Sequence, residues 1–256
     1  MKKLILDLIL KKNIRLNEQV HLLIFSSEQS LPKILPGQFV QVKIDDSPAT
    51  FLRRPFSVNF VDDENNELWL LIQIVGAGTL KLSETFPGAS VNMILPLGNS
   101  FTFPDKKDEK ILLVGGGSGI APLLFWGSYL RKADFNPEFL IGARSRAYLV
   151  ELEEFEKYGK VFITTEDGSK GEKGFVTDHS IFKERKFDRI YSCGPTPMMK
   201  AVGAYAIKNN TFCEVSLENT MGCGIGACLC CVTDTTAGRV CVCTEGTVFN
   251  IAKLKW

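Results

Sequence analysis

The feature that most constrains this 256-residue chain is a group of six cysteines between Cys223 and Cys243, out of eight in total. Cys223, Cys228 and Cys231 have the spacing C-x4-C-x2-C, and Cys243 follows after eleven further residues. This is the plant-type pattern of a [2Fe–2S] cluster. A short loop wraps one side of such a cluster, and the glycines between these cysteines permit the tight backbone that the loop requires. The pattern therefore predicts an iron–sulfur cluster near the end of the chain.

The spacing leaves two ligand choices open. Cys230 adjoins Cys231, and Cys241 lies two residues before Cys243, on the same face of a strand. A zinc site is the alternative use of these cysteines, but a zinc ribbon uses two C-x2-C pairs and only Cys228 with Cys231 forms one. The cysteine-rich segment also has too few large apolar residues for a core of its own. We therefore expect the bound cluster to organise this segment.

Composition and charge exclude several other classes of protein. The chain has 30 Lys and Arg against 29 Asp and Glu, a net charge of +1, which gives no electrostatic reason to expect nucleic acid or an anionic membrane as partner. Its start weakly mimics an export signal, but Asp7 interrupts the apolar run and no small-residue cleavage site follows. The uncharged residues 111–130 contain five glycines and Pro122, which argues against a membrane span. We predict a soluble, cytoplasmic protein.

The order of elements predicts two domains before the cysteine segment. Short β-rich runs, such as 38–44 and 68–75, fill the first hundred residues and are typical of an antiparallel barrel. Residues 104–110 look like a solvated linker. Strands then alternate with helices, which predicts a parallel sheet covered on both faces. The expected strands are 111–114, 139–142, 161–164 and 190–193, with a further strand possible at 213–217, and the expected helices are 121–132, 149–158 and 197–208.

The predicted fold class is therefore multidomain, β followed by α/β. We expect an antiparallel β-barrel over residues 1–102, a parallel-sheet nucleotide-binding domain over 103–210, and a small cluster domain over 211–256.

A glycine-rich turn follows the first strand of the predicted parallel sheet and precedes a helix. In this geometry helix N-terminal amides and a close backbone can hold a pyrophosphate. A tight packing turn is the alternative. The sequence Cys193-Gly194-Pro195 ends another strand and would lie at the same edge of the sheet, which favours the nucleotide site. The glycines of the turn are Gly115, Gly116, Gly117 and Gly119.

The first domain has two motifs that suit a flavin dinucleotide. Arg53 to Ser57 combines cations, an aromatic ring and a hydroxyl, while Gly76-Ala77-Gly78-Thr79 offers backbone amides for an anion. The alternative interpretation is that Arg53 and Arg54 are surface charges, that Phe56 belongs to the core and that the glycines form a hairpin turn.

With these motifs in place, the whole chain resembles the ferredoxin–NADP reductase superfamily. Within it the chain is similar to the electron-transfer subunits, iron–sulfur flavoproteins, of NAD-dependent dihydroorotate dehydrogenases. The resemblance maps the flavin motif onto Arg54, Pro55, Phe56 and Ser57, with Phe in place of the common Tyr, the strand bordering the flavin onto Leu71, Ile72 and Gln73, and the phosphate motif onto Gly76, Gly78 and Thr79.

The resemblance also implies cofactors and roles. It implies bound FAD, a [2Fe–2S] cluster held by Cys223, Cys228, Cys231 and Cys243, and NAD as electron acceptor at the glycine-rich turn with Gly194 and Pro195. Cys193 would contact the nicotinamide edge as the catalytic residue. Glu218, just before the cluster loop, either approaches the nicotinamide side or is a surface carboxylate, and the surface carboxylate is the favoured interpretation. Electrons would arrive from an FMN-containing catalytic subunit in pyrimidine biosynthesis and cross the cluster and FAD to NAD+. The implied assembly is a heterotetramer of two such chains and two catalytic subunits.

Alternatives to this function stay open at the level of sequence. A diaphorase-type subunit could serve a hydrogenase, a glutamate synthase or a bifurcating transhydrogenase, although Cys223 as the first cluster ligand favours the dihydroorotate system. A nucleotide-responsive binding module with a structural zinc tail is the alternative from a different class. NADP also stays open, because Arg144 and Arg146 follow the second strand of the parallel sheet, where the nucleotide ribose would lie.

Overall fold

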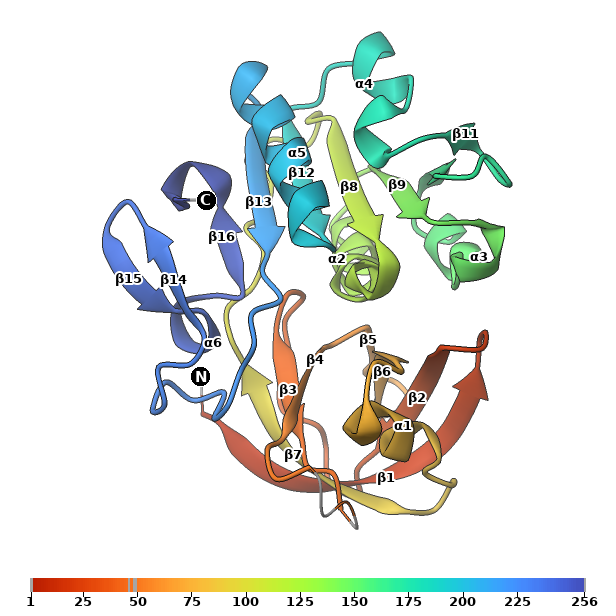
Figure 1. The fold of residues 1–256 in the computed structure, drawn as a ribbon, viewed down its shortest axis with the longest axis vertical. Helices are drawn as coiled ribbons and strands as arrows, with labels where there is room; N and C mark the ends of the chain where they lie inside the picture. The colour runs from red at the N-terminus through yellow and green to blue at the C-terminus, as the bar shows by residue number, and fades with distance from the viewer. Residues whose placement is uncertain (1, 46, 48–49, 256) are drawn as a thin grey trace.

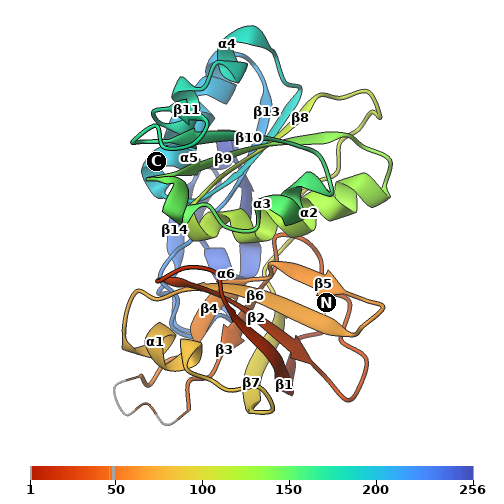
Figure 2. The same cartoon turned by 90° about the vertical axis from the view of Figure 1, so that its right-hand side faces the viewer.

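The computed structural model describes residues 2–45, 47 and 50–255 and contains two seven-stranded sheets, one above the other in Figure 1. The first sheet is antiparallel, with the strand order β4-β3-β7-β1-β2-β6-β5. It curves into a half-barrel with β4 and β5 at its two edges (Figure 2). Its strands are β1 (Leu4–Arg15), β2 (Val20–Ser26), β3 (Phe39–Val42), β4 (Arg54–Ser57), β5 (Phe60–Asp62), β6 (Glu67–Gln73) and β7 (Ser90–Leu97).

Alternating apolar residues build the core of this barrel. Leu8 and Leu10 of β1 are fully buried, as are Val40 and Val42 of β3. Because successive side chains of a strand point to opposite faces, this spacing places one face of each strand in the core. The short helix α1 (Ala77–Ser83) follows β6. In the sequence the start of this helix looks like a glycine turn, because glycine has a low helix propensity.

The second sheet has the order β11-β10-β9-β8-β12-β13-β16, parallel except for its last strand. Helices lie on both faces, and α2 runs along the side that faces the barrel (Figure 2). The strands are β8 (Ile111–Gly116), β9 (Pro137–Ala143), β10 (Lys160–Thr165), β11 (Glu172–Lys173), β12 (Arg189–Cys193), β13 (Phe212–Ser216) and β16 (Val248–Asn250). The helices are α2 (Ala121–Lys132), α3 (Leu152–Glu156), α4 (Ile181–Glu184) and α5 (Thr196–Lys208).

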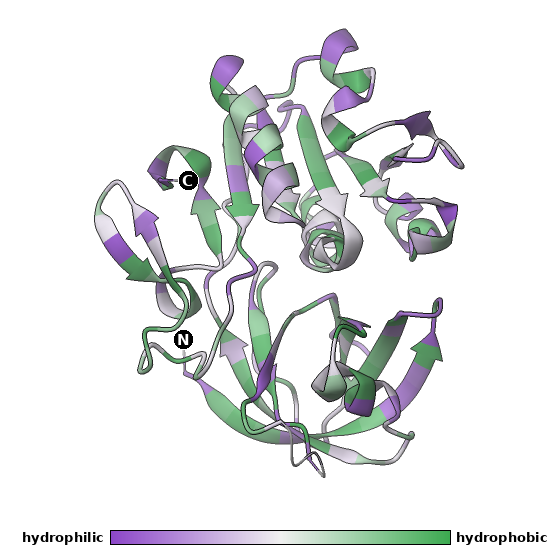
Figure 3. Ribbon diagram, in the orientation of Figure 1, coloured by the Kyte–Doolittle hydropathy of each residue, from purple (hydrophilic) through white to green (hydrophobic). Residues whose placement is uncertain are grey.

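Strand β8 shows why this sheet is covered on both sides. Leu112 and Val114 pack in one core cluster with α5, whereas Leu113 packs in another with α2. Figure 3 shows the central strands of this sheet in the green of hydrophobic residues. The predicted fold class is confirmed. One predicted helix, 149–158, is shorter than expected, because residues 146–148 form a 3-10 turn and Glu151 has a left-handed backbone with φ of 57°.

The cysteine-rich segment is attached to the second sheet rather than separate from it. It contains the hairpin β14 (Val232–Thr235) and β15 (Gly238–Cys241) and the short helix α6 (Val242–Glu245). Strand β16 then pairs with β13. Val242 and Ile251 share a core cluster with α5, so packing as well as any cluster holds this segment in place. The division at residues 102 and 210 stays a prediction, and the second sheet continues across residue 210.

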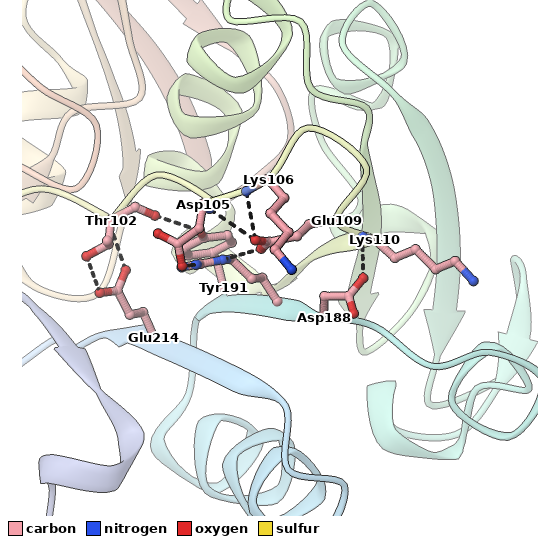
Figure 4. Close-up of polar contacts among 9 residues, drawn as sticks. Thr102, Asp105, Lys106, Glu109, Lys110, Asp188, Tyr191 and Glu214 are labelled. Carbon is pink, nitrogen blue, oxygen red and sulfur yellow. Dashed lines mark hydrogen bonds and ion pairs between the residues drawn. The ribbon is translucent and has the colours of Figure 1, made fainter.

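The segment that joins the two sheets is tethered to the second one, as Figure 4 shows. Arg189 of β12 forms ion pairs with Asp105 and Glu109. The Thr102 backbone N–H and hydroxyl donate to the Glu214 carboxylate at 2.8 and 2.7 Å. Residues 104–110 are largely exposed, as expected for a linker, but these contacts fix both ends of the segment. The relative placement of the two sheets is therefore restrained by side chains that lie far apart in the sequence.

Among the described residues, no helix is long and apolar enough to cross a membrane.

Candidate functional site

A cavity of about 310 Å³ lies where the barrel, the glycine-rich turn and the cysteine-rich segment meet. The barrel contributes strand β4 and parts of β3 and β6. The turn contributes Ser118 and Ala121, and the chain from Leu217 to Met221 closes the remaining side together with Thr247. Three regions that are remote in the sequence therefore enclose one space.

The flavin-motif residues lie together on the barrel side of this cavity. All four residues of β4, Arg54 to Ser57, line it. Of the next predicted strand, Leu71 and Gln73 line the cavity, whereas Ile72 is fully buried in the barrel core. The strand alternation explains this split, because Ile72 points to the opposite face. Their roles as flavin contacts stay predictions.

Thr79 also lines the cavity and organises the turn before α1. Its hydroxyl oxygen accepts hydrogen bonds from the backbone N–H groups of Val75 at 2.9 Å and Gly76 at 3.2 Å. A side chain at Gly78 would place its Cβ 3.2 Å from Arg54 Nε, so glycine lets the turn approach the guanidinium closely. The turn and Arg54 thus form one polar corner suited to a phosphate.

The two neighbouring arginines have different surroundings. Arg53 Nη1 donates to the carbonyl oxygens of Asn92 at 3.0 Å and Gln41 at 3.2 Å, which binds β4 to β7 and β3. Arg54 lines the cavity, and its Nη1 donates to Leu52 O at 2.8 Å. Arg53 is therefore a structural residue, and Arg54 is free to meet an anion in the cavity.

Substitution of Arg54 with glutamine is expected to weaken FAD binding by about 1.5–3 kcal/mol, the range for losing a hydrogen bond to a charged group. Titration of flavin-free protein with FAD, followed by flavin fluorescence, measures this. Arg53→Gln is the matched comparison, and we expect it to lower the melting temperature more and the FAD affinity less. If Arg53→Gln weakened FAD binding more than Arg54→Gln did, the assignment of Arg54 as the anion-binding arginine would be contradicted.

The glycine-rich turn and the Cys193-Gly194-Pro195 turn lie side by side. Gly115 at the end of β8 pairs with Cys193 at the end of β12. These are adjacent strands between which the connection changes direction along the sheet, the position where open α/β sheets bind ligands. A Cβ on Gly119 would lie 2.4 Å from the Gly194 Cα, and one on Gly194 would lie 2.9 Å from the Gly116 carbonyl oxygen. The two turns are packed backbone to backbone.

Cys193 lies behind the cavity and close to Glu218. Its Sγ lies 3.9 Å from Glu218 Oε1, and the residue is fully buried. Burial and the neighbouring carboxylate raise the pKa of the Cys193 thiol well above its usual value. Partial desolvation in the wall of the cavity also raises the pKa of the Glu218 carboxyl. Glu218 is exposed, as expected for a surface carboxylate, and it also lines the cavity beside Cys193, which stays a neutral thiol.

The cysteine loop presents backbone N–H groups to sulfur. Cys223 Sγ accepts from the backbone N–H of Ala227 at 3.2 Å and of Ile225 and Cys228 at 3.4 Å. These hydrogen bonds, that of Ile225 foremost, lower the pKa of Cys223 to about 6. Gly224, with φ of +70°, allows the backbone to turn around the sulfur. The loop is built to hold a thiolate.

The four predicted ligands form two pairs. Cys223 and Cys228 share backbone-to-sulfur contacts in the loop, and the Cys243 N–H donates to Cys231 Sγ at 3.4 Å. Within the described part of the chain, no three Cys, His, Asp or Glu side chains are arranged as a site for one metal ion. Two thiol pairs with amide donors fit the two irons of a [2Fe–2S] cluster. The identity of the four cluster ligands stays a prediction. Cys241 also lies close to these cysteines, with Cys231 as its main neighbour.

Several cavity residues carry no motif in the sequence. Phe39 of β3, Asn219 and Thr247 line the cavity, and Thr247 donates to Gly37 O at 2.6 Å. An isolated aromatic or polar residue on a strand or loop gives no signal of a site. Only the tertiary contacts reveal these three residues.

The fold and site define an iron–sulfur flavoprotein reductase of the ferredoxin reductase type. The C-terminal residues 218–255 match the family profile described as the iron–sulfur cluster binding domain of dihydroorotate dehydrogenase B, and residues 113–204 match the oxidoreductase NAD-binding domain. The chain belongs to the family of dihydroorotate dehydrogenase B (NAD(+)) electron transfer subunits. It is 39% identical to the member from Shouchella clausii over 86% of each chain, and 40% identical to that from Caldanaerobacter subterraneus subsp. tengcongensis over 93% of each.

Solved structures agree with this class. The chain is similar to one in the structure of an NADH-dependent reduced ferredoxin–NADP oxidoreductase that performs flavin-based electron bifurcation, with a TM-score of 0.88, 31% identity, and coverage of 97% of this chain and 90% of that one. The ferredoxin reductase of carbazole 1,9a-dioxygenase shares the fold, with a TM-score of 0.69 at 19% identity over 82% of this chain and 67% of that one.

Proposed function

We propose that this chain is the electron-transfer subunit that passes electrons from a dihydroorotate-oxidising, FMN-containing catalytic subunit to NAD+ in pyrimidine biosynthesis. The observation that carries the proposal is the shared cavity. The flavin motif of β4, the nucleotide turn and the chain that leads into the cysteine loop all border it. Met221 lines the cavity, and Cys223 begins the cysteine loop two residues later.

The chemistry of the three cofactors requires this order. Bound FAD exchanges a hydride with a nicotinamide and single electrons with an iron–sulfur cluster, so it must lie between them. The protein supplies position. Arg54 and the Thr79 turn would hold the flavin phosphates, β4 and β6 would border its ring, and the paired turns at Gly119 and Gly194 would hold the nucleotide.

Cys193 and Glu218 would border the nicotinamide. A neutral thiol held behind the cavity cannot act as a nucleophile, since the thiolate is the reactive form. We infer that Glu218, which lines the cavity, orients the polar edge of the reacting ring, and that Cys193 supports this part of the site from behind the cavity wall. Transfer of a hydride requires the two rings at about 3–3.5 Å, so this contact contributes by positioning.

The test is the composition and activity of the purified protein. We expect a yellow-brown protein with FAD and two irons per chain that oxidises NADH with an artificial dye and leaves dihydroorotate unchanged alone. Addition of the FMN-containing catalytic subunit should allow dihydroorotate to reduce NAD+. NADPH in place of NADH should react more slowly. A colourless protein with zinc would contradict the proposal. So would dihydroorotate oxidation at the same rate with and without the second subunit.

A second candidate is a subunit of a bifurcating transhydrogenase, which the similarity in fold to the NADH-dependent reduced ferredoxin–NADP oxidoreductase favours. Co-purification distinguishes the two candidates. If the first candidate is right, the chain should co-purify with a dihydroorotate-oxidising partner in a complex of two chains of each kind. If the second is right, it should co-purify with a partner that reacts with ferredoxin. We propose the first, with a cytoplasmic location.

A further inference from the structure

Gln41 is a fully buried polar residue to which the proposed function gives no role. It lies in β3, opposite Pro55 of the flavin-motif strand β4. Its side chain is 0% exposed, and among the described residues neither its Nε2 nor its Oε1 has a hydrogen-bond partner. A buried polar group without a partner loses its hydrogen bonds to water and destabilises the folded protein. A group so enclosed therefore needs a partner that the cofactor-bound protein supplies.

The side chain of Gln41 is directed at the cysteine loop. Val40 and Val42 point into the barrel core, so Gln41 and Phe39 share the opposite face of β3. A Cβ on Gly224 would lie 2.6 Å from Gln41 Cγ and 2.7 Å from Nε2. Gly224 follows Cys223, and the loop therefore lies directly on the carboxamide.

The surroundings of Gln41 identify its missing partner. The loop N–H groups of Ile225, Ala227 and Cys228 are already directed to Cys223 Sγ. The Gln41 amide reaches the same loop from the barrel side, and it carries two N–H donors. Sulfur atoms of an iron–sulfur cluster and its thiolates accept such hydrogen bonds, which help to set the reduction potential.

We propose that the Gln41 amide donates a hydrogen bond to a sulfur atom on the Cys223 side of the cluster and thereby raises the cluster's reduction potential. The donor stabilises the reduced form, which carries one more negative charge. Gln41 is thus a positioning and tuning residue that connects the flavin-binding barrel to the cluster loop. The inference rests on the proposed function, because it requires a bound cluster.

The test is a redox titration of the complete protein with Gln41 replaced by methionine, which has a similar volume and no N–H donor. We expect iron and FAD contents to be unchanged. The ratio of reduced to oxidised cluster at a fixed ambient potential should fall about tenfold, equivalent to about 59 mV for a one-electron couple. The flavin absorbance in the same titration should keep its midpoints.

Gln38→Met is the matched control. Gln38 is also buried, but its Oε1 accepts from the Leu35 N–H at 2.7 Å and its Nε2 donates to Gly98 O at 3.1 Å. Its replacement should lower the melting temperature and leave the cluster potential unchanged. An unchanged cluster potential in Gln41→Met, with the cluster present, would overturn the inference. Absence of any cluster from the unsubstituted protein would instead overturn the proposed function.

A measurement on the unsubstituted protein covers the case in which Gln41→Met fails to fold. Protein labelled with ¹⁵N in glutamine side chains should show a weak ¹⁵N coupling in the pulsed EPR spectrum of the reduced cluster. No detectable coupling would contradict a hydrogen bond from Gln41.

Discussion

Replacement of Cys243 with serine is expected to remove the iron–sulfur cluster, whereas replacement of Cys241 with serine is expected to leave both irons bound. Cys243 is 1% exposed and its N–H donates to Cys231 Sγ, which places it at the paired-thiol site. Cys241 ends the hairpin strand β15 opposite Val232. A serine oxygen is a poorer ligand than a thiolate for these irons, so one lost ligand of four should release the cluster.

Iron analysis, visible absorbance and EPR of the reduced proteins measure this result. Cys231→Ser and Cys230→Ser form a second pair, with cluster loss expected only in the first. We also expect faster proteolysis between β13 and β16 in the variants without cluster. Retention of the cluster in Cys243→Ser together with its loss in Cys241→Ser would show that the two cysteines have the opposite roles.

Gly119→Ala is expected to separate the two turns at the nucleotide site. The new Cβ would lie 2.4 Å from both the Cα and the N of Gly194, and 2.6 Å from the Cys193 carbonyl carbon. These are backbone atoms of an adjacent strand end, so they cannot move away as a flexible side chain does. Overpacking of this kind costs about 1–3 kcal/mol. The displaced turn should also bind NADH more weakly, because its amides no longer meet the pyrophosphate.

Thermal unfolding and the KM for NADH in a dye-reduction assay measure the two effects. Gly117→Ala is the control for stability in the same turn. Gly117 has φ of +59°, and among the described residues, apart from its own chain neighbours, no atom lies within 4 Å of the position that an alanine methyl group would take there. Only backbone strain of about 1–2 kcal/mol therefore opposes this substitution. A Gly119→Ala protein with the stability and the KM of the original would contradict the close packing of the turns.

Local patterns explain why much of the fold is predictable. Val40, Val42 and Ile44 lie in the barrel core and alternate with the polar residues Gln41 and Lys43, and this period is visible in the sequence. The uncharged stretch with a central glycine run similarly indicates a buried strand, a turn and a helix. Strand β16 escapes prediction, because three residues that pair antiparallel with β13 carry no periodicity of their own.

The candidate site is less predictable. Arg53 and Arg54 are equivalent in sequence, yet one bonds β7 and the other lines the cavity. Glu218 is an exposed carboxylate, and only the fold shows that it lines the cavity with Cys193 Sγ 3.9 Å from its Oε1. Each of these distinctions depends on a contact between residues far apart in the chain, which local composition does not encode.

The sequence alone predicts the chemistry that the chain can support. It does so through the spacing of the cysteines, the glycines of the nucleotide turn and the patterns that predict two kinds of sheet. Motifs of this kind are local, since a short loop or strand end supplies all the required atoms. How these parts meet depends on the folded chain. Folding encloses one cavity between the barrel, the turn and the cysteine-rich segment, and it buries Gln41 against Gly224 with no partner among the described residues. Burial and contact across domains are properties of the packed chain, because they depend on atoms brought together from distant positions.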